Sequence, residues 1–263
     1  VRKIQGANAM VKIAMDDESA FWKQRGALVE EVHTIQDDVG KPLYLPWKDA
    51  TYSNATLSNI IKMWHSIQGS WRLMEKHAAA TNVTYTRVAM LRSDVVYMTP
   101  IDIWERGDTA VYGTHFDAHN THAVIPGFAK WPISDRMIYG PIEAVRVWAD
   151  TRFAYLQRSK TKCSNPASTC NGNFLHSESV VKRLLKSVSW EEHATMCFFR
   201  ARVDESVWFR DCDGPPHISS PHIQMPPVQA RRPLIENVLG RPCRNPRILT
   251  RPPNFRVAIG CEE

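Results

Sequence analysis

Apolar side chains recur at steps of three and four residues between positions 57 and 80, at Ile60, Trp64, Ile67, Trp71 and Met74. This spacing places them on one face and predicts an amphipathic helix. Thr56 or Ser58 can cap its first turn. A stripe of this kind is typical of a helix that packs on a sheet, although it can also line a cofactor site.

Two short apolar runs, residues 88–91 and 95–98, follow this helix. Runs without alternation are typical of strands covered on both faces, as in a parallel α/β sheet. The residues between the runs are polar and include Arg92 and Asp94. The pattern therefore predicts a buried strand that ends at a charged loop.

Further strands and helices follow downstream. Residues 137–139 are predicted to form a strand, and residues 195–209 a hairpin that turns at Asp204 and Glu205. Residues 143–151 and 180–185 are predicted to be helices, the second with Ser177 as a candidate cap. The alternation of helices and strands predicts an α/β fold with a mixed, mostly parallel sheet flanked by helices.

The last fifty residues have no hydrophobic periodicity, and ten of them are Pro. We expect one folded domain over residues 1–213 and a flexible, irregular Pro- and Arg-rich tail over residues 214–263. The tail has seven Arg against three Glu, a net +4, and so carries most of the chain's net charge of +6. Its one aromatic residue is Phe255. Since nucleic-acid binders interleave basic and aromatic side chains, no nucleic-acid partner is expected.

Cysteine usage and sequons favour the secretory pathway, with the Golgi lumen as the expected location. The six cysteines lie in the C-terminal part without a C-x-x-C spacing, which favours disulfides over zinc, and Cys163 and Cys170 flank a loop that such a bond would close. Asn54 and Asn82 each begin an N-glycosylation sequon. No window approaches the roughly 18 apolar residues of a spanning helix. A membrane anchor is therefore expected only upstream of Val1.

Arg92 and Asp94 follow the predicted strand at its exit, where ligand sites of α/β sheets collect. A carboxylate there can hold a divalent cation against a diphosphate, and a guanidinium two residues away can bind phosphate oxygens. The pair therefore suits a nucleotide diphosphate. The alternative is a structural ion pair at the edge of the sheet, and the tripeptide alone does not decide between them.

Asp135 and Arg136 stand just before a predicted strand, and His176 and Glu178 stand at the start of a predicted helix. Asp135 either forms a salt bridge at the strand edge or faces the Asp94 loop, where it can bind a sugar hydroxyl or act as a base. Because a helix N-terminus favours anions, Glu178 is either ordinary first-turn chemistry or a catalytic carboxylate.

Four segments in this order resemble a group of poorly characterised eukaryotic proteins with a GT-A-like glycosyltransferase fold: the helix with Trp64 and Trp71, LRSDVVYMTPIDIW, ISDRMIYGPIEAV and LHSESVVKRLL. The resemblance covers about residues 40–213. It implies that residues 92–94 stand where GT-A enzymes carry a D-x-D motif, which binds the nucleotide ribose and a Mn²⁺ or Mg²⁺ ion on the diphosphate. Arg92 replaces the first acid, so either Asp94 alone supplies a metal-binding side chain or Arg92 takes over part of the charge neutralisation.

The resemblance also implies that Asp135 and Arg136 line the acceptor or donor-sugar side, and that His176 to Glu178 close the site. If the anomeric centre inverts, Asp135 or Glu178 is the candidate base that deprotonates the acceptor hydroxyl, whereas a retaining reaction needs neither. GT-A domains open with a strand that contacts the base of the nucleotide. Residues 10–15 fit that strand poorly, so the domain is expected to be incomplete at its N-terminus.

Three hypotheses for function result. The first is a hexosyl- or pentosyltransferase that moves a sugar from a nucleotide-sugar donor to a glycan or glycoprotein acceptor. The second is a catalytically inactive carbohydrate-binding or scaffold protein of the same fold, which Arg92 in place of the first acid permits. The third is a polyanion binder that acts through residues 214–263, whose affinity would fall steeply with salt.

Overall fold

The computed structural model describes the chain in separate stretches, and all statements on structure refer to them: residues 17–34, 36, 40, 54–98, 101–104, 122–128, 132–163, 176–193, 196–201, 207–208, 233, 236, 242–243, 245–251 and 256–262.

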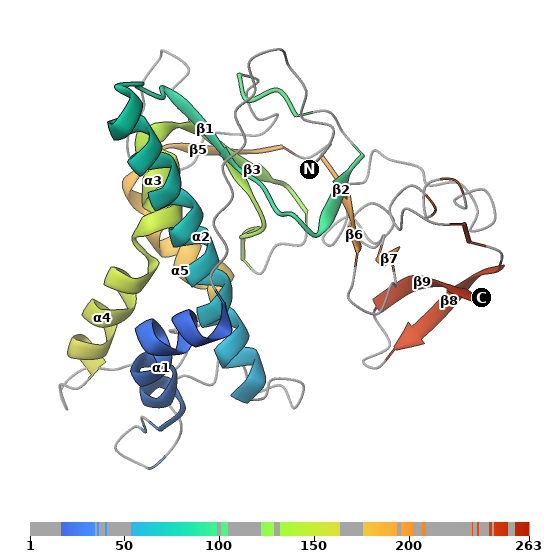
Figure 1. Cartoon of the computed structure of the whole chain (residues 1–263), viewed down its shortest axis with the longest axis horizontal. Helices are drawn as coiled ribbons and strands as arrows, with labels where there is room; N and C mark the ends of the chain where they lie inside the picture. Colours follow the sequence, from blue (N-terminus) through green and yellow to red (C-terminus); the bar gives the residue numbers. More distant parts are fainter. Residues whose placement is uncertain are drawn as a thin grey trace.

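A four-stranded sheet lies at the centre of the fold (Figure 1). Its strands, in spatial order, are β1 (Arg87–Met90), β4 (Ile138–Pro141), β3 (Ala123–Pro126) and β5 (Trp190–His193). β3 and β5 run parallel, whereas β4 is antiparallel to both of its neighbours. The fold is therefore mixed α/β as expected, but the expectation of a mostly parallel sheet is wrong for these strands. Residues 127–137 connect β3 to β4, and this connection is shorter than the crossover of about a dozen or more residues that parallel neighbours need.

A second sheet of five strands is antiparallel throughout. Its strands, in spatial order, are β2 (Val95–Tyr97), β6 (Phe198–Ala201), β7 (Val207–Trp208), β9 (Arg256–Glu262) and β8 (Asn245–Arg251). The pairing of β6 with β7 confirms the predicted hairpin. Its turn lies outside the described residues.

The C-terminal residues contribute two strands to this second sheet. β8 and β9 form an antiparallel pair, and β9 pairs with β7 through Val207 opposite Ile259 and Trp208 opposite Ala258. The expectation of an irregular tail over the whole of residues 214–263 is therefore wrong for these strands. The high Pro content hid them, because Pro is rare inside a sheet except on edge strands, and β8 with its Pro246 is such an edge.

Five α-helices accompany the sheets in the described chain. They are α1 (Glu18–Thr34), α2 (Asn54–Thr81), α3 (Ile142–Asp150), α4 (Arg152–Cys163) and α5 (Ser177–Leu184). α2 confirms the helix predicted from the apolar stripe, but it begins at Asn54, so Thr56 and Ser58 lie within its first turns and do not cap it. α5 likewise begins one residue earlier than a Ser177 cap requires, and His176 is its cap.

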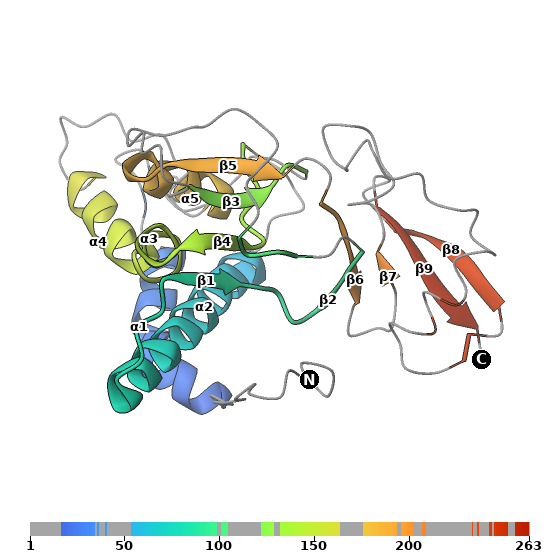
Figure 2. The same cartoon turned by 90° about the horizontal axis from the view of Figure 1, so that it is seen from above.

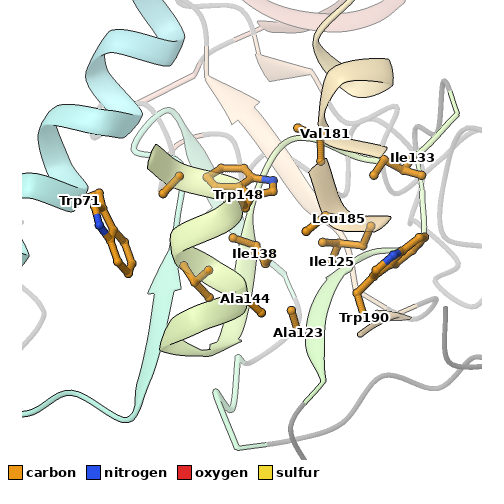
Figure 3. Close-up of a cluster of buried hydrophobic side chains, with 12 residues drawn as sticks. Trp71, Ala123, Ile125, Ile133, Ile138, Ala144, Trp148, Val181, Leu185 and Trp190 are labelled. Carbon is orange, nitrogen blue, oxygen red and sulfur yellow. The ribbon is translucent and has the colours of Figure 1, made fainter. Parts of the chain in front are cut away.

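The two faces of the central sheet are covered differently. The face of Ala123, Ile125 and Ile138 packs against α2, α3 and α5, with Trp71 and Trp148 among the largest fully buried side chains (Figure 3). The opposite face of Val124 and Tyr139 packs against the second sheet, as Phe198 and Val207 lie in the same cluster. Alternating side chains of each strand thus enter different cores.

β1 contacts both cores, with Val88 and Met90 on the helix side and Ala89 on the other. It is only half-buried because it forms one edge of the sheet, and it is not the fully covered strand that the apolar run predicted. The two apolar runs belong to different sheets, since β2 pairs with β6.

Several strand ends lie together along one side of the central sheet, which we call the strand-end edge (Figure 2). Met90 at the end of β1 lies opposite Ile138 at the start of β4. Pro126 at the end of β3 lies opposite His193 at the end of β5, and the Gly127 amide donates to the His193 carbonyl at 2.9 Å. The loops before β4 and after β1 therefore meet at this edge, which carries the candidate site.

No helix among the described residues is long and apolar enough to span a membrane. Cys197 and Cys243 are buried and disulfide-bonded. Cys170 lies outside the described residues, so the loop closed by Cys163 and Cys170 stays a prediction.

Candidate functional site

Arg92 and Asp94 lie in the loop between β1 and β2, at the end of β1 where the sequence predicts them. They form a bidentate ion pair: Arg92 Nε donates to Asp94 Oδ1 at 2.7 Å, and Arg92 Nη2 donates to Asp94 Oδ2 at 2.6 Å. Their side chains are 28% and 39% exposed, so solvent reaches both. This is the structural ion pair that the sequence left open as an alternative.

Backbone contacts hold this loop in place. The Arg92 amide donates to the Tyr97 hydroxyl at 3.1 Å, and the Ala201 amide donates to the Asp94 carbonyl at 2.9 Å. Burial raises the pKa of Tyr97, so the hydroxyl is neutral and available for this contact. The ion pair is thereby anchored to β2 and β6.

The arrangement around Asp94 fits a divalent metal poorly. Both Asp94 carboxylate oxygens accept from Arg92. In the described part of the chain, no group of three or more His, Cys, Asp or Glu is placed to bind an ion. Mg²⁺ and Mn²⁺ prefer several oxygen ligands, which Asp94 bound to Arg92 does not supply. Dependence on Mn²⁺ or Mg²⁺ stays a prediction.

Asp135 and Glu178 lie close enough to interact electrostatically, although 43 positions separate them along the chain. Asp135 stands three residues before β4, and Glu178 is the second residue of α5. Burial, followed by the negative charge of Asp135, raises the pKa of Glu178 to about 8. Arg136 and Arg152 oppose this rise. Glu178 is therefore mostly protonated at neutral pH, which is not the state of an ordinary first-turn glutamate.

His176 joins this pair as the cap of α5. Its Nδ1 accepts from the Ser179 amide at 3.3 Å, and its Nε2 lies 3.6 Å from Glu178 Oε2. Burial lowers the pKa of His176, while Asp135 acts in the opposite direction. With Nδ1 as an acceptor, the ring proton of neutral His176 lies on Nε2, towards Glu178.

Arg136 reaches the aromatic core from the loop before β4. Its guanidinium carbon lies 5.8 Å from the centre of the Phe128 ring and 6.0 Å from that of Phe198. The Phe198 ring also meets Tyr97 edge-to-face at 5.6 Å. Tyr97 binds the Arg92 amide, so a short series of contacts connects Arg136 to the loop of the ion pair.

Arg152 is the site residue that sequence reasoning missed. It begins α4 directly after α3, it is 1% exposed, and its guanidinium carbon lies 4.1 Å from the centre of the Trp148 ring. Burial lowers the pKa of Arg152 to about 10, and Asp135 and Glu178 counteract that fall. A signal was present: Arg152 follows Val145 and Trp148 on the apolar helix stripe, where a basic residue is out of place.

The structure therefore brings Asp135, Arg136, His176 and Glu178 together and adds Arg152. We call these five residues the acid–arginine cluster. Three separate segments supply them: the loop before β4, the start of α4 and the start of α5. Arg92 and Asp94 form the second part of the candidate site, across the Tyr97 and Phe198 rings. Two carboxyls and two guanidiniums, with shifted pKa values among them, are typical of sites that bind polar substrates or transfer protons.

No protein-family model, curated protein or solved structure matches this chain.

Proposed function

We propose that this protein is a glycosyltransferase that uses a nucleotide-sugar donor, with the acid–arginine cluster as its reaction site. The observation that carries the proposal is the convergence of Asp135 and Glu178 with two guanidiniums at the strand-end edge of the sheet. The resemblance of four segments to GT-A-like proteins gives the donor class. The position of Arg92 and Asp94 at the end of β1 agrees with it.

Glu178 is the carboxyl best suited to proton transfer. A group with a pKa near 8 exchanges its proton readily close to neutral pH, and general acid–base catalysis is most effective there. In an inverting transfer its ionised form would accept the proton of the acceptor hydroxyl, and His176 Nε2 beside it would orient the carboxylate. Asp135 would bind sugar hydroxyls, as carboxylates commonly do.

In this proposal, arginine side chains neutralise the charge of the leaving diphosphate. Arg92 and Arg136 are both placed at the sheet edge, one after β1 and the other before β4. A guanidinium can donate two parallel hydrogen bonds to phosphate oxygens. For Arg92 this requires that it exchange Asp94 for the phosphate, which partial exposure of the pair allows.

The proposal is tested by measuring nucleotide release from UDP-, GDP- and CMP-linked sugars, with and without acceptor glycans. UDP- and GDP-sugars would release the nucleoside diphosphate, and CMP-sugars would release CMP. Glu178→Gln should reduce kcat by about a hundred-fold or more, since general acid–base residues contribute about 10² to 10⁴. Glu143→Gln is the matched control, because Glu143 is an exposed first-turn glutamate of α3. Equal rates in the two variants would contradict the assignment of Glu178.

One observation favours the second hypothesis, a binding protein without turnover. Asp94 is held by Arg92 on both oxygens, so the position that carries a metal-binding acid in GT-A enzymes is already paired. A protein of this kind would bind a nucleotide sugar or glycan and release no nucleotide. Binding by calorimetry together with an absence of release in the assay above would identify it.

A further inference from the structure

The Arg152 side chain is buried with four of its five N–H donors unused. Its Nε donates to the Trp148 carbonyl at 2.9 Å. Its Nη1 and Nη2 are buried and have no hydrogen-bond partner within the described part of the chain. Asp135 and Glu178 attract it electrostatically, yet neither is hydrogen-bonded to it.

Such an arrangement is unfavourable for the protein alone. An ionised group that leaves water without hydrogen bonds strongly destabilises the fold, and an apolar side chain of similar size is often neutral or better. The guanidinium is fixed by Nε on one side and by the Trp148 ring on the other. Its two terminal nitrogens thus form a rigid fork beside Asp135 and Glu178, prepared for a partner outside the described chain.

The fork and the local charge specify that partner. Two parallel N–H donors match the two oxygens of a carboxylate or a phosphate. Asp135 and Glu178 already lie near the Arg152 guanidinium. They repel a diphosphate, with its several negative charges, more strongly than a carboxylate with one. The carboxylate is therefore the better match.

Resting on the proposed function, we propose that Arg152 binds the carboxylate of a uronic acid, carried by the donor or by the acceptor of the transfer. Arg152 would then select acidic sugars over their neutral counterparts.

Binding of matched sugar pairs to the full chain tests this assignment by thermal shift and calorimetry. Glucuronate is compared with glucose and with inorganic phosphate, UDP-glucuronate with UDP-glucose, and a glucuronate-terminated disaccharide with its glucose-terminated counterpart. The acidic member of a pair should bind at least about ten-fold more tightly, as expected for hydrogen bonds to a charged group. The UDP pair identifies a donor carboxylate and the disaccharide pair an acceptor carboxylate.

Variants at Arg152 connect the preference to the residue. Arg152→Met should abolish the preference for the acidic sugar while the melting temperature stays equal or rises, because the unsatisfied charge is gone. Arg152→Lys keeps the charge without the fork and should retain only part of the preference. Arg158→Met is the control, since Arg158 is an exposed residue of α4.

The outcomes separate this inference from the proposed function. If UDP-glucose and UDP-glucuronate bind equally and no other pair differs, the donor site stands and the carboxylate assignment is overturned. If phosphate binds through Arg152 and glucuronate does not, the assignment is likewise overturned. If glucuronate binds through Arg152 while no nucleotide sugar binds, the assignment holds and the glycosyltransferase proposal fails. Because the wild-type comparison needs no variant, unfolding of Arg152→Met would not remove the test.

Discussion

At the scale of single residues, the acid–arginine cluster is governed by burial. Glu178 and His176 both lose solvation at the start of α5, so the pKa of Glu178 rises and the pKa of His176 falls. Each is then uncharged at neutral pH, and the remaining charges are those of Asp135 and two guanidiniums. The cluster is therefore poised for proton exchange and carries an unsatisfied arginine, two properties that stability alone does not explain.

The raised pKa of Glu178 predicts a pH-dependent contribution to stability. The folded state binds the proton more tightly than the unfolded chain, whose glutamate titrates near 4.5. The stabilisation is complete below about pH 4.5 and is lost as the pH rises to about 8. Glu178→Gln has no such proton. Its free energy of unfolding should therefore increase relative to that of the wild type as the pH rises across this window. The gain should reach a few kcal/mol, since one pKa unit corresponds to about 1.4 kcal/mol.

Urea denaturation of both proteins between about pH 5 and pH 8 measures the difference. Asp135, Arg136, Arg152 and His176 face Glu178 and are present in both proteins, so the comparison isolates the proton of Glu178. Parallel pH profiles for the two proteins would show that the pKa of Glu178 is not raised.

At the scale of elements, one buried hydrogen bond joins α2 to the start of α5. Trp64 Nε1 donates to Ser177 Oγ at 3.1 Å, and both side chains are buried. Ser177→Ala leaves the indole N–H without a partner and should destabilise the fold by about 1 to 3 kcal/mol. Chemical denaturation measures the change, and Ser66→Ala is the control because Ser66 is exposed on α2. If Ser177→Ala costs as much in a Trp64→Phe background, the two residues are not coupled.

The sheet depends on a glycine at its centre. Gly140 in β4 has φ +140°, and a Cβ there would lie 2.8 Å from the Ala123 Cα and 3.0 Å from the His122 carbonyl oxygen. Both atoms belong to backbone and cannot move aside cheaply. Gly140→Ala should therefore lower the free energy of unfolding by at least about 1 to 3 kcal/mol.

Gly69→Ala is the matched control for this substitution. Gly69 lies in α2, and apart from its chain neighbours and the backbone of its own helix no atom lies within 4 Å of the place that a Cβ would take. Ala there should therefore be neutral or stabilise by up to about 1 kcal/mol. Equal melting temperatures for Gly140→Ala and the wild type would contradict the strand pairing around Gly140.

At the scale of the whole molecule, the C-terminal strands complete the second sheet. β9 covers the edge of β7, whose Val207 and Trp208 are buried. A chain that ends at residue 244 would expose that edge and should melt at lower temperature and aggregate more readily. Thermal denaturation and light scattering compare the two chains. An unchanged melting temperature would show that residues 245–263 are dispensable for the stability of the fold.

Local patterns predicted much of this molecule. The apolar stripe at Trp64 and Trp71 predicted α2, and the polar residues beside apolar runs identified Asp135 and Glu178 as candidate site residues. Strand direction could not be predicted in this way, because it depends on connections such as the one between β3 and β4. Arg152 was missed since helix periodicity indicates which face is buried and not which neighbours meet there. Secretory location, glycosylation of Asn54 and Asn82, and an anchor upstream of Val1 stay predictions.

The central claim is that the edge carrying Asp94 and the acid–arginine cluster binds a nucleotide sugar. Thermal-shift titration with UDP, GDP and CMP, each with Mn²⁺, Mg²⁺ or chelator, tests it on the wild type and on Asp94→Asn. We predict stabilisation by one nucleotide class, altered in Asp94→Asn, and the response to chelator will show whether a metal takes part. The absence of a shift with all three nucleotides would contradict the account.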